Sequence, residues 1–384
     1  MTMTSKIALG VLLFALLVLG SRRCHGDDQQ PPATTAVPVK TVEGMPSFTD
    51  YDAMPQEVDE LLCPTTAMTA EPTAVEPTAA GEQIVFASCR NGEDEVFVMN
   101  ADGTGVRQLT DNNDFDGYPV WSPDRERIAF ISTSRNDWEV SVIGVDGTGL
   151  RRLTNNDALD GHPSWSPDGK RIAFTSTRDG YSNIFVINAD GTDLQQLTDN
   201  DRWDGPPSWS PNGKRIAFSR FRDGDVEIFV MNADGTDLQQ LTESNGLFDP
   251  PSWSPDGKRI AFTSTRDGYS YIFVINADGT DLQQLTDNDD DDYNGSWSPD
   301  GDRIAFHSDR DGDIEIFVMN ADGTDLQQLT DNDRWDGPPS WSPDGKRIAF
   351  ASDRDGDREV FVMNADGTGL YSTGQKGLFI SWGG

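Results

Sequence analysis

The sequence WSPDGKRIAF, at residues 165–174, recurs almost unchanged along this chain of 384 residues. It returns at 253–262 and 341–350, and with small changes at 121–130, 209–218 and 297–306, so the interval is 44 residues each time. A second marker, NADGT, begins at residues 100, 188, 232, 276, 320 and 364, and GVDGT fills the gap at residue 144. The chain from residue 84 onward is therefore a tandem array built from one repeated unit.

Each unit contains four short strand patterns. In the unit around 208–241 they read PSW, RIAFSR, EIFVMN and DLQQL, where apolar and polar residues alternate. The Ser-Pro-Asn-Gly between the first two patterns, or Ser-Pro-Asp-Gly in other units, is typical of a type I turn with Pro second and Gly fourth. NADGT plays the same part between the third and fourth patterns, because Gly235 can take a positive φ. Both motifs are thus predicted to be turns.

Four strands every 44 residues, without helical periodicity in 84–384, predict an all-β fold, a β-propeller with one unit per blade. The second strand pattern begins seven times, which predicts seven four-stranded blades with six as the alternative count: Ile84, Ile128, Ile172, Ile216, Ile260, Ile304 and Ile348. The array begins with QIVFASC, which has no tryptophan strand before it, and ends with LFISWGG, which is a tryptophan strand. We therefore expect residues 378–382 to complete the first blade and close the ring, which leaves no long strand edge unpaired.

These repeats resemble those of a known family. WSPDGKRIAF, RDG and IFVMNADGTDLQQLT are similar to the WD-like repeats of TolB-type propellers, also found in the propeller domains of prolyl oligopeptidases and tricorn-type proteases. The resemblance covers about 300 residues and implies the fold but no particular activity, because one propeller hosts many unrelated functions. TolB itself carries an α/β domain before a six-bladed ring, whereas a short Pro-rich segment precedes the predicted ring here. The chain is therefore predicted to be TolB-like and not TolB itself.

The N-terminal region predicts export. Lys6 precedes IALGVLLFALLVLG, fourteen apolar residues or glycines, a length typical of a signal peptide and short for a membrane span. Residues 1–26 are therefore predicted to be a signal peptide, with an N-terminal anchor as the alternative. Residues 27–82 are rich in Pro, Thr and Ala, which predicts a disordered tether before the propeller at 83–384. The expected location is periplasmic, extracellular or anchored at the outer side of the membrane.

The composition disfavours several classes of function. A net charge of −35 argues against binding to nucleic acid or to an anionic membrane surface, because neutralising phosphates requires clustered Lys and Arg. The three histidines, His25, His162 and His307, are too few for a histidine metal centre, and no G-x-S-x-G motif occurs. The predicted function is an exported, monomeric, non-catalytic scaffold that binds a protein or a polysaccharide. A cation-binding structural propeller and an enzyme of the oligogalacturonate-lyase type are the alternatives, the latter needing histidine ligands that are not found.

One face of the predicted propeller is the more variable. Strands run up and down in turn, so SPDG and NADGT fall on one face, while loops such as TSTRDGYSN and TDNDRWDGPP fall on the other. Aromatic side chains flanked by Arg and Asp on the second face are typical of protein and glycan contacts. The predicted ligand-binding residues are Tyr181, Tyr269, Tyr271, Arg202, Trp203, Arg334 and Trp335. The tyrosines are expected to be the more exposed, and a wedge between blades is the alternative role of the two tryptophans.

Carboxylates on the same face support a Ca²⁺ site as a second hypothesis, and no other cofactor is predicted. Asp309, Asp311 and Asp313 alternate in SDRDGDIEI, where Gly312 would let the backbone curl around a cation. A second set lies at the entry to four inner strands: Asp116, Asp160, Asp204 and Asp336. The alternative is that RDG forms a hairpin turn with an Arg–Asp contact and that the entry aspartates cap loop amides.

Cysteines are few and permit one disulfide. Cys63 lies in the predicted tether and Cys89 in the first blade. An oxidising compartment would allow these two thiols to pair, and two unrelated thiols are the alternative.

Overall fold

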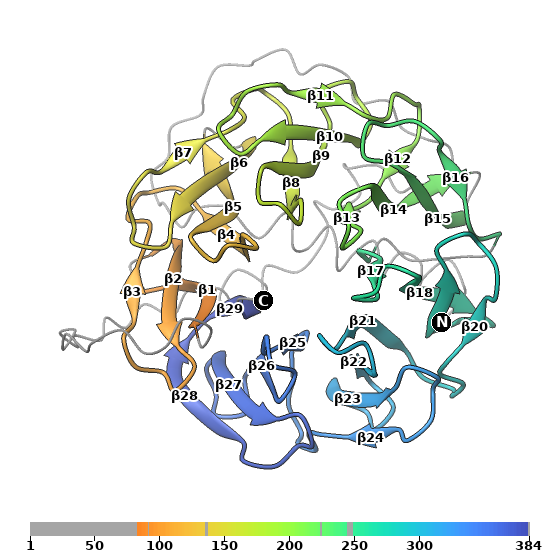
Figure 1. Cartoon of the computed structure of the whole chain (residues 1–384). Coiled ribbons are helices and arrows are strands. Elements are labelled where there is room, and N and C mark those ends of the chain that lie inside the picture. Colours follow the sequence, from red (N-terminus) through yellow and green to blue (C-terminus); the bar gives the residue numbers. More distant parts are fainter. Residues whose placement is uncertain (1–82, 91, 135–136, 223–224, 244–248, 383–384) are drawn as a thin grey trace, which may run out of the picture. The chain divides into compact units, whose positions relative to one another are not determined.

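The computed structural model describes residues 83–90, 92–134, 137–222, 225–243 and 249–382, which form seven β-sheets arranged in a ring (Figure 1). Strands are the only regular elements of this described part. No helix within it is long and apolar enough to cross a membrane. Each sheet is one antiparallel blade, and its strands follow one another from the centre of the ring outward (Figure 1).

The two innermost strands of each blade carry the WSPDGKRIAF repeat. The inner strands are β29 (Leu378–Trp382), β4 (Asp116–Trp121), β8 (Asp160–Trp165), β12 and β13 (Trp203–Asp204 and Ser208–Trp209), β17 (Ser252–Trp253), β21 (Asp292–Trp297) and β25 (Ser340–Trp341). The second strands are β1 (Gln83–Cys89), β5 (Arg127–Ser134), β9 (Arg171–Ser176), β14 (Arg215–Arg222), β18 (Arg259–Arg266), β22 (Arg303–Ser308) and β26 (Arg347–Ser352). The fourth blade counts five strands because its inner strand is split in two.

The two outer strands flank the NADGT turn. The third strands are β2 (Asp94–Asn100), β6 (Asp137–Gly144), β10 (Asn183–Asn188), β15 (Asp225–Asn232), β19 (Tyr269–Asn276), β23 (Glu315–Asn320) and β27 (Glu359–Asn364). The outermost strands are β3 (Arg107–Gln108), β7 (Arg151–Arg152), β11 (Gln195–Gln196), β16 (Gln239–Gln240), β20 (Gln283–Gln284), β24 (Gln327–Gln328) and β28 (Tyr371–Lys376).

Strand β29 closes the ring as predicted. It pairs antiparallel with β1, with Ile84 opposite Trp382 and Val85 opposite Ser381, and the first sheet has the order β29-β1-β2-β3. Figure 1 shows this C-terminal strand inside the first blade. The prediction of seven blades is confirmed, and the alternative of six is wrong.

The blades are joined through their tryptophans, which belong to the buried apolar clusters between neighbouring sheets. Six of these indole N–H groups donate to a backbone oxygen of the preceding blade at 3.1–3.3 Å: those of Trp121, Trp165, Trp209, Trp253, Trp297 and Trp341. An arginine of the preceding blade also lies over the indole ring, 4.6–5.0 Å from its centroid, at six tryptophans: Trp165, Trp209, Trp253, Trp297, Trp341 and Trp382. Such cation–π contacts add to apolar burial.

The two predicted turns are confirmed. Gly169 N donates to Ser166 O at 2.8 Å, and Ser166 Oγ accepts from Arg171 N, so the Ser-Pro-Asp-Gly segment is a hydrogen-bonded β-turn. In the NADGT turn, Gly235 N donates to Asn232 O at 2.9 Å and Gly235 has a φ of 82°. A positive φ of this size suits glycine, which has no Cβ.

Deleting residues 378–384 is expected to lower the melting temperature by several degrees and to cause self-association. The deletion removes the partner of β1 and leaves a long strand edge open to other chains. Differential scanning calorimetry and size-exclusion chromatography check both effects. An unchanged melting temperature with a monodisperse monomer would contradict the role of β29 in closure.

Arg125→Gly is expected to raise the free energy of unfolding by about 1 kcal/mol, because Arg125 occupies the glycine position of the turn with a φ of 60°. Gly169→Arg is the reverse exchange in the next blade, where φ is 67°, and should lower the free energy of unfolding by a similar amount. Urea denaturation of both variants measures the change. Two neutral variants, or opposite signs, would show that these turns do not depend on glycine.

Candidate functional site

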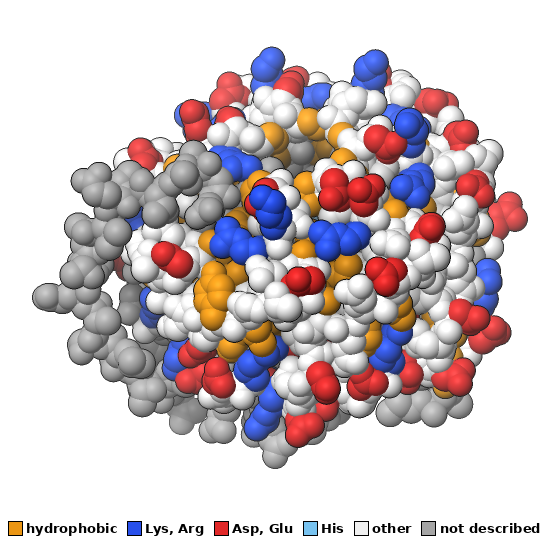
Figure 2. Space-filling model, turned by 60° about the horizontal axis from the view of Figure 1, so that its bottom comes forward, with side chains coloured by type: hydrophobic (Ala, Val, Ile, Leu, Met, Phe, Trp, Pro, Cys, Tyr) orange, Lys and Arg blue, Asp and Glu red, His pale blue; other side chains and the backbone are white. Residues whose placement is uncertain are grey.

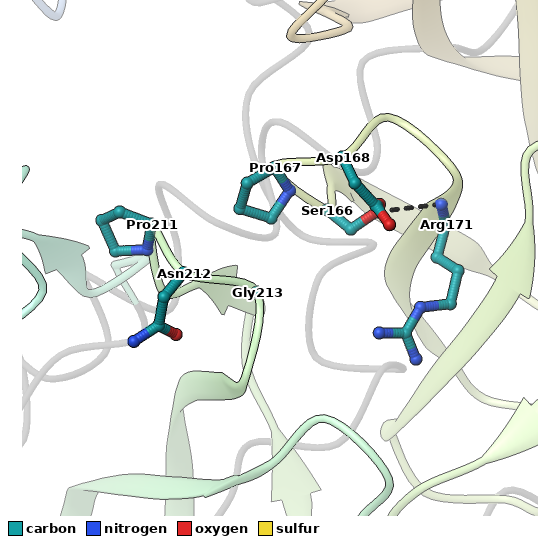
Figure 3. A pocket seen from close by; sticks show the side chains of 7 residues that line it. All are labelled: Ser166, Pro167, Asp168, Arg171, Pro211, Asn212 and Gly213. Atoms are coloured by element: carbon teal, nitrogen blue, oxygen red, sulfur yellow. Dashed lines mark hydrogen bonds between the residues drawn. The ribbon is translucent and has the colours of Figure 1, made fainter.

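The propeller has two unlike faces. The SPDG and NADGT turns form one, which we call the turn face, and the loops between blades together with the hairpins between second and third strands form the other, the loop face. On the turn face, a cavity of about 280 Å³ lies between two neighbouring SPDG-type turns. Figure 3 shows its lining by Ser166, Pro167, Asp168, Arg171, Pro211, Asn212 and Gly213. These residues belong to the repeated turn, so this cavity follows from the architecture of the blade.

The loop face differs from blade to blade at one position of the inner strand, which we call the inner rim. Its members are Phe379, Tyr118, His162, Pro206, Pro250, Asn294 and Pro338. The four that are not proline have φ values of 51–56°, and their strands shift register there against the second strand. A positive φ is costly for a bulky side chain, so the surrounding sheet must hold these four bulges.

The first three blades make an aromatic arc on the inner rim. The rings of Phe379 and Tyr118 lie 4.0 Å apart between centroids, and the rings of Tyr118 and His162 lie 6.5 Å apart. Burial lowers the pKa of His162 to about 4, so its imidazole is neutral at pH 7. Burial, and then the charge of Asp94, raises the pKa of Tyr118. The arc therefore offers flat, uncharged rings.

The sixth blade contributes a polar pair to the inner rim. Asn294 Nδ2 lies 2.9 Å from His307 Nε2, and Asn294 N donates to Thr263 Oγ1 at 3.3 Å. The ring of Tyr293 meets that of His307 edge-on at 5.8 Å. Because the amide nitrogen donates to Nε2, the proton of the neutral imidazole lies on the buried Nδ1, and the ring also interacts with the backbone of Asp336. Burial lowers the pKa of His307 to about 4, against smaller opposing effects of Asp336 and Asp292.

A family model described as the TolB β-propeller domain matches residues 117–206, 204–308 and 293–378. The chain belongs to the TolB β-propeller family. Among solved structures it is similar to TolB from Acinetobacter baumannii, at 20% identity over 79% of this chain and 83% of that one, with a TM-score of 0.54. These findings confirm the predicted TolB-like family. No curated protein matches the chain.

Enzymes share the fold of this TolB-family propeller. An oligogalacturonate lyase from Vibrio parahaemolyticus is 14% identical over 73% of this chain and 86% of that one, with a TM-score of 0.61. A puromycin-hydrolyzing peptidase from Mycobacterium tuberculosis is 16% identical, with a TM-score of 0.63, and the match covers 79% of this chain but 53% of the peptidase. At such identities the likeness shows the fold alone, so chemistry must be judged from the site.

The ligand-binding residues predicted for this TolB-family propeller are spread over its loop face. Tyr181, Tyr269, Arg202 and Trp203 are half-buried, on blades three to five, and Arg334 is exposed before the half-buried Trp335 of blade seven. The ring of Trp335 lies so close to Gly337 that a Cβ there would be 2.6 Å from the indole, and Arg358 lies 5.1 Å from its centroid. Both contacts lie within blade seven, so the role of Trp335 as a wedge between blades stays a prediction.

The expected exposure of Tyr271 is wrong. It is 5% exposed and packs with Trp253 and Phe273 in the cluster between blades four and five. The reason lies in the strand: Tyr271 stands in β19 at the position of Glu95, Glu139 and Glu315 in other blades, and that position points inward.

The entry aspartates of the TolB-family ring are mostly paired with arginine. Asp160 accepts from Arg178 at 3.0 Å, Asp204 from Arg220 at 3.0 Å and Asp336 from Arg354 at 2.8 Å. Asp292, which sequence reasoning missed although it obeys the 44-residue interval, accepts from Arg310 at 2.8 Å. The Arg–Asp contact of the alternative reading is thus present in these four blades. Asp116 has no such arginine within the described part, and burial raises its pKa.

The loop with Asp309, Asp311 and Asp313 is a hairpin turn, with Gly312 N donating to Asp309 O at 2.9 Å. Asp309 Oδ1 accepts from Asp291 N, while Asp311 and Asp313 are exposed. Within the ranges that the structure describes, no group of three or more His, Cys, Asp or Glu is placed to hold a metal ion. The two predicted aspartate sets are therefore not assembled into ligand shells.

Cys89 ends strand β1 and is disulfide-bonded. Both other cysteines of the chain lie outside the described residues. The pairing of Cys63 with Cys89 therefore stays a prediction.

His307→Thr is expected to weaken the acid sensitivity of this TolB-family propeller. An unfolded histidine binds a proton near pH 6.5, whereas His307 in the fold has a pKa of about 4, so lowering the pH from 7 to 5 favours unfolding by roughly 1–2 kcal/mol. Threonine stands at the equivalent positions 175 and 263.

Thermal unfolding at pH 7 and pH 5 measures this effect. The variant should lose less stability on acidification than the wild type, and Tyr293→Phe, which changes no histidine, should keep the wild-type difference. Equal losses in wild type and His307→Thr would show that His307 titrates normally.

Proposed function

We propose that the protein is an exported, non-catalytic scaffold that binds a protein or a polysaccharide through the inner rim of its loop face. The observation that carries the proposal is a contrast within the repeats: most positions are nearly identical from blade to blade, whereas the inner-rim position varies. Residues 188–218 and 320–350 differ only at Asn212 and Asp344, so the array tolerates near-identical blades. The inner rim nevertheless holds five residue types in seven blades.

The divergence has a structural cost that the fold itself does not require. Three blades use proline at the inner rim and have no positive φ there, although Asp204 opposite Arg220 and Ser208 opposite Ala217 show the same register shift in blade four. The shift can therefore be built without a residue at positive φ. Four blades instead hold Phe379, Tyr118, His162 and Asn294 at positive φ. Elsewhere in the described part positive φ occurs at Arg125 and at aspartates, whereas the inner rim places two large aromatic side chains and a histidine there. Strain retained at such side chains supports a functional use of them.

The side chains of the inner rim suit recognition better than catalysis. The aromatic arc can stack on a sugar ring or on an apolar side chain of a protein, and the half-buried Asn294 adds hydrogen-bonding groups at the sixth blade. Figure 2 shows acidic and basic side chains interspersed on the face in view, without one large basic patch. Together with the net charge of −35, this favours a partner other than nucleic acid.

Tyr118→Pro combined with His162→Pro tests the proposal, because both changes copy the proline of blades four, five and seven. The double variant should fold with an unchanged melting temperature and lose at least about tenfold in binding to a partner found by glycan array or by pull-down from exported extract. Asp168→Asn on the turn face copies Asn212 and is the matched control, expected to bind as the wild type does.

Retention of full binding by the folded double variant would contradict the inner rim as the binding surface. Turnover of a bound glycan or peptide by the purified protein would contradict the non-catalytic assignment.

A further inference from the structure

The junction between blades two and three shows how this fold satisfies its buried carboxylates. Glu139 on β6 accepts from Thr154 Oγ1 at 2.5 Å and from Asn156 N at 2.6 Å, so both of its oxygens have donors. Asn156 Nδ2 donates to Asp160 Oδ2 at 2.6 Å. Arg178 Nη2 then reaches both oxygens of Asp160, at 3.3 and 3.0 Å. Two acids are thus buried together with five donated hydrogen bonds and one cation.

The junction between blades one and two repeats this arrangement, but no cationic side chain of the described residues takes part in it. Glu95 Oε1 accepts from Asn112 N at 2.7 Å, and Asn112 Nδ2 donates to Asp116 Oδ2 at 2.7 Å. Thr110 interacts with both carboxylates and Ser132 with that of Asp116, yet Glu95 Oε2 and Asp116 Oδ1 are buried and make no hydrogen bond among the described residues. Ser134 stands 44 residues before Arg178, where the sibling blade has its arginine.

Leaving two carboxylate oxygens buried and unpaired is unfavourable. Glu95 is 3% exposed and Asp116 is 1% exposed, so water in bulk does not solvate either group. A buried carboxyl is tolerated when it is paired, bound to a metal or protonated. Burial raises the pKa of Glu95 to about 7, so this group is partly protonated at neutral pH when no cation neutralises it. In blades three, six and seven the guanidinium of an arginine pairs with the equivalent aspartate. The equivalent position in blade two is therefore one that accepts a positive charge.

The position is reachable from the loop face. Arg178, Arg310 and Arg354 enter it from the hairpin between second and third strands, and their side chains remain 22%, 17% and 15% exposed. The equivalent position in blade two lies at the hairpin between β5 and β6.

We propose that Glu95 and Asp116 bind a divalent hard cation, of the Ca²⁺ class, in the place that an arginine guanidinium holds in blades three, six and seven. The two unpartnered atoms are both carboxylate oxygens, which hard cations prefer, and two carboxylates match a double positive charge. Water completes the coordination shell. A site with two protein carboxylates belongs to the weak class, with a dissociation constant of about 10⁻⁴–10⁻³ M. The proposal is independent of the proposed ligand of the inner rim.

Thermal unfolding of the full chain in CaCl₂ at about ten times this dissociation constant, against EDTA at matched ionic strength and constant pH, tests the proposal. A cation that binds the folded state alone should raise the melting temperature by about 2–4 °C. Calorimetric titration with CaCl₂ gives the stoichiometry, expected to be one per chain. NaCl in place of CaCl₂ should give no rise.

Glu95→Gln and Asp116→Asn should each abolish the response to CaCl₂ and the calorimetric signal. Asp160→Asn is the matched control: it breaks the contact with Arg178 in the sibling blade and lowers stability, but it should keep the full response to CaCl₂. This comparison separates loss of the site from general destabilisation.

Ser134→Arg supplies the missing guanidinium. It should raise the melting temperature in EDTA and remove the response to CaCl₂, because the position is then filled.

The proposal is overturned if the wild type shows neither a melting shift nor a calorimetric signal in CaCl₂, or if Glu95→Gln and Asp116→Asn respond as the wild type does. The Arg135→Ala variant tests whether the side chain of Arg135, which lies outside the described part, neutralises Glu95 and Asp116. A wild type without a response, together with an Arg135→Ala variant that gains one, would show that the chain neutralises this pair itself.

Discussion

The ring depends on one contact, made by the tryptophan of each inner strand with the blade before it. Six indoles donate a hydrogen bond across the junction, and an arginine of the preceding blade lies over the ring in six junctions. Neither blade can bury its apolar face alone, so stability comes from the junctions and every junction must be alike. This explains why WSPDGKRIAF is repeated: the tryptophan and the arginine contact the neighbouring blades, and the turn between them keeps these two residues at a fixed spacing.

A scaffold of nearly identical junctions leaves few positions free to differ. The turn face repeats Ser-Pro-Asp-Gly with small changes, because each residue of that turn makes a hydrogen bond or sets a backbone angle. The inner rim is not constrained in this way, since proline, asparagine and aromatic residues all occur there. Specific recognition is therefore concentrated where the repeat departs from itself, on a frame that holds strained backbone without unfolding.

Sequence reasoning reached the fold because the decisive signals are local. Turn chemistry and a 44-residue period fix the strands, and incomplete ends of the array predict closure by β29. It failed where tertiary contacts decide. The bulge at Tyr118 puts a bulky residue at positive φ, which no local preference favours, and Tyr271 looked like a loop residue although β19 extends beyond it. Asp292 lies 44 residues before Asp336, so the repeat interval alone could have added it to the predicted set of entry aspartates.

The closure of the ring is also where the repeated contacts are least complete. Gln83 stands where the other second strands begin with arginine, and the indole N–H of Trp382 has no acceptor within the described part. Among the described residues, no arginine pairs with Asp116 in the neighbouring junction as in its siblings. Blade one is assembled from the two ends of the array, so its strands are brought together by a long loop closure, which carries an entropic cost that no other blade bears. Stabilisation added at this place, by a cation or by a disulfide at Cys89, opposes that cost more directly than the same interaction elsewhere in the ring.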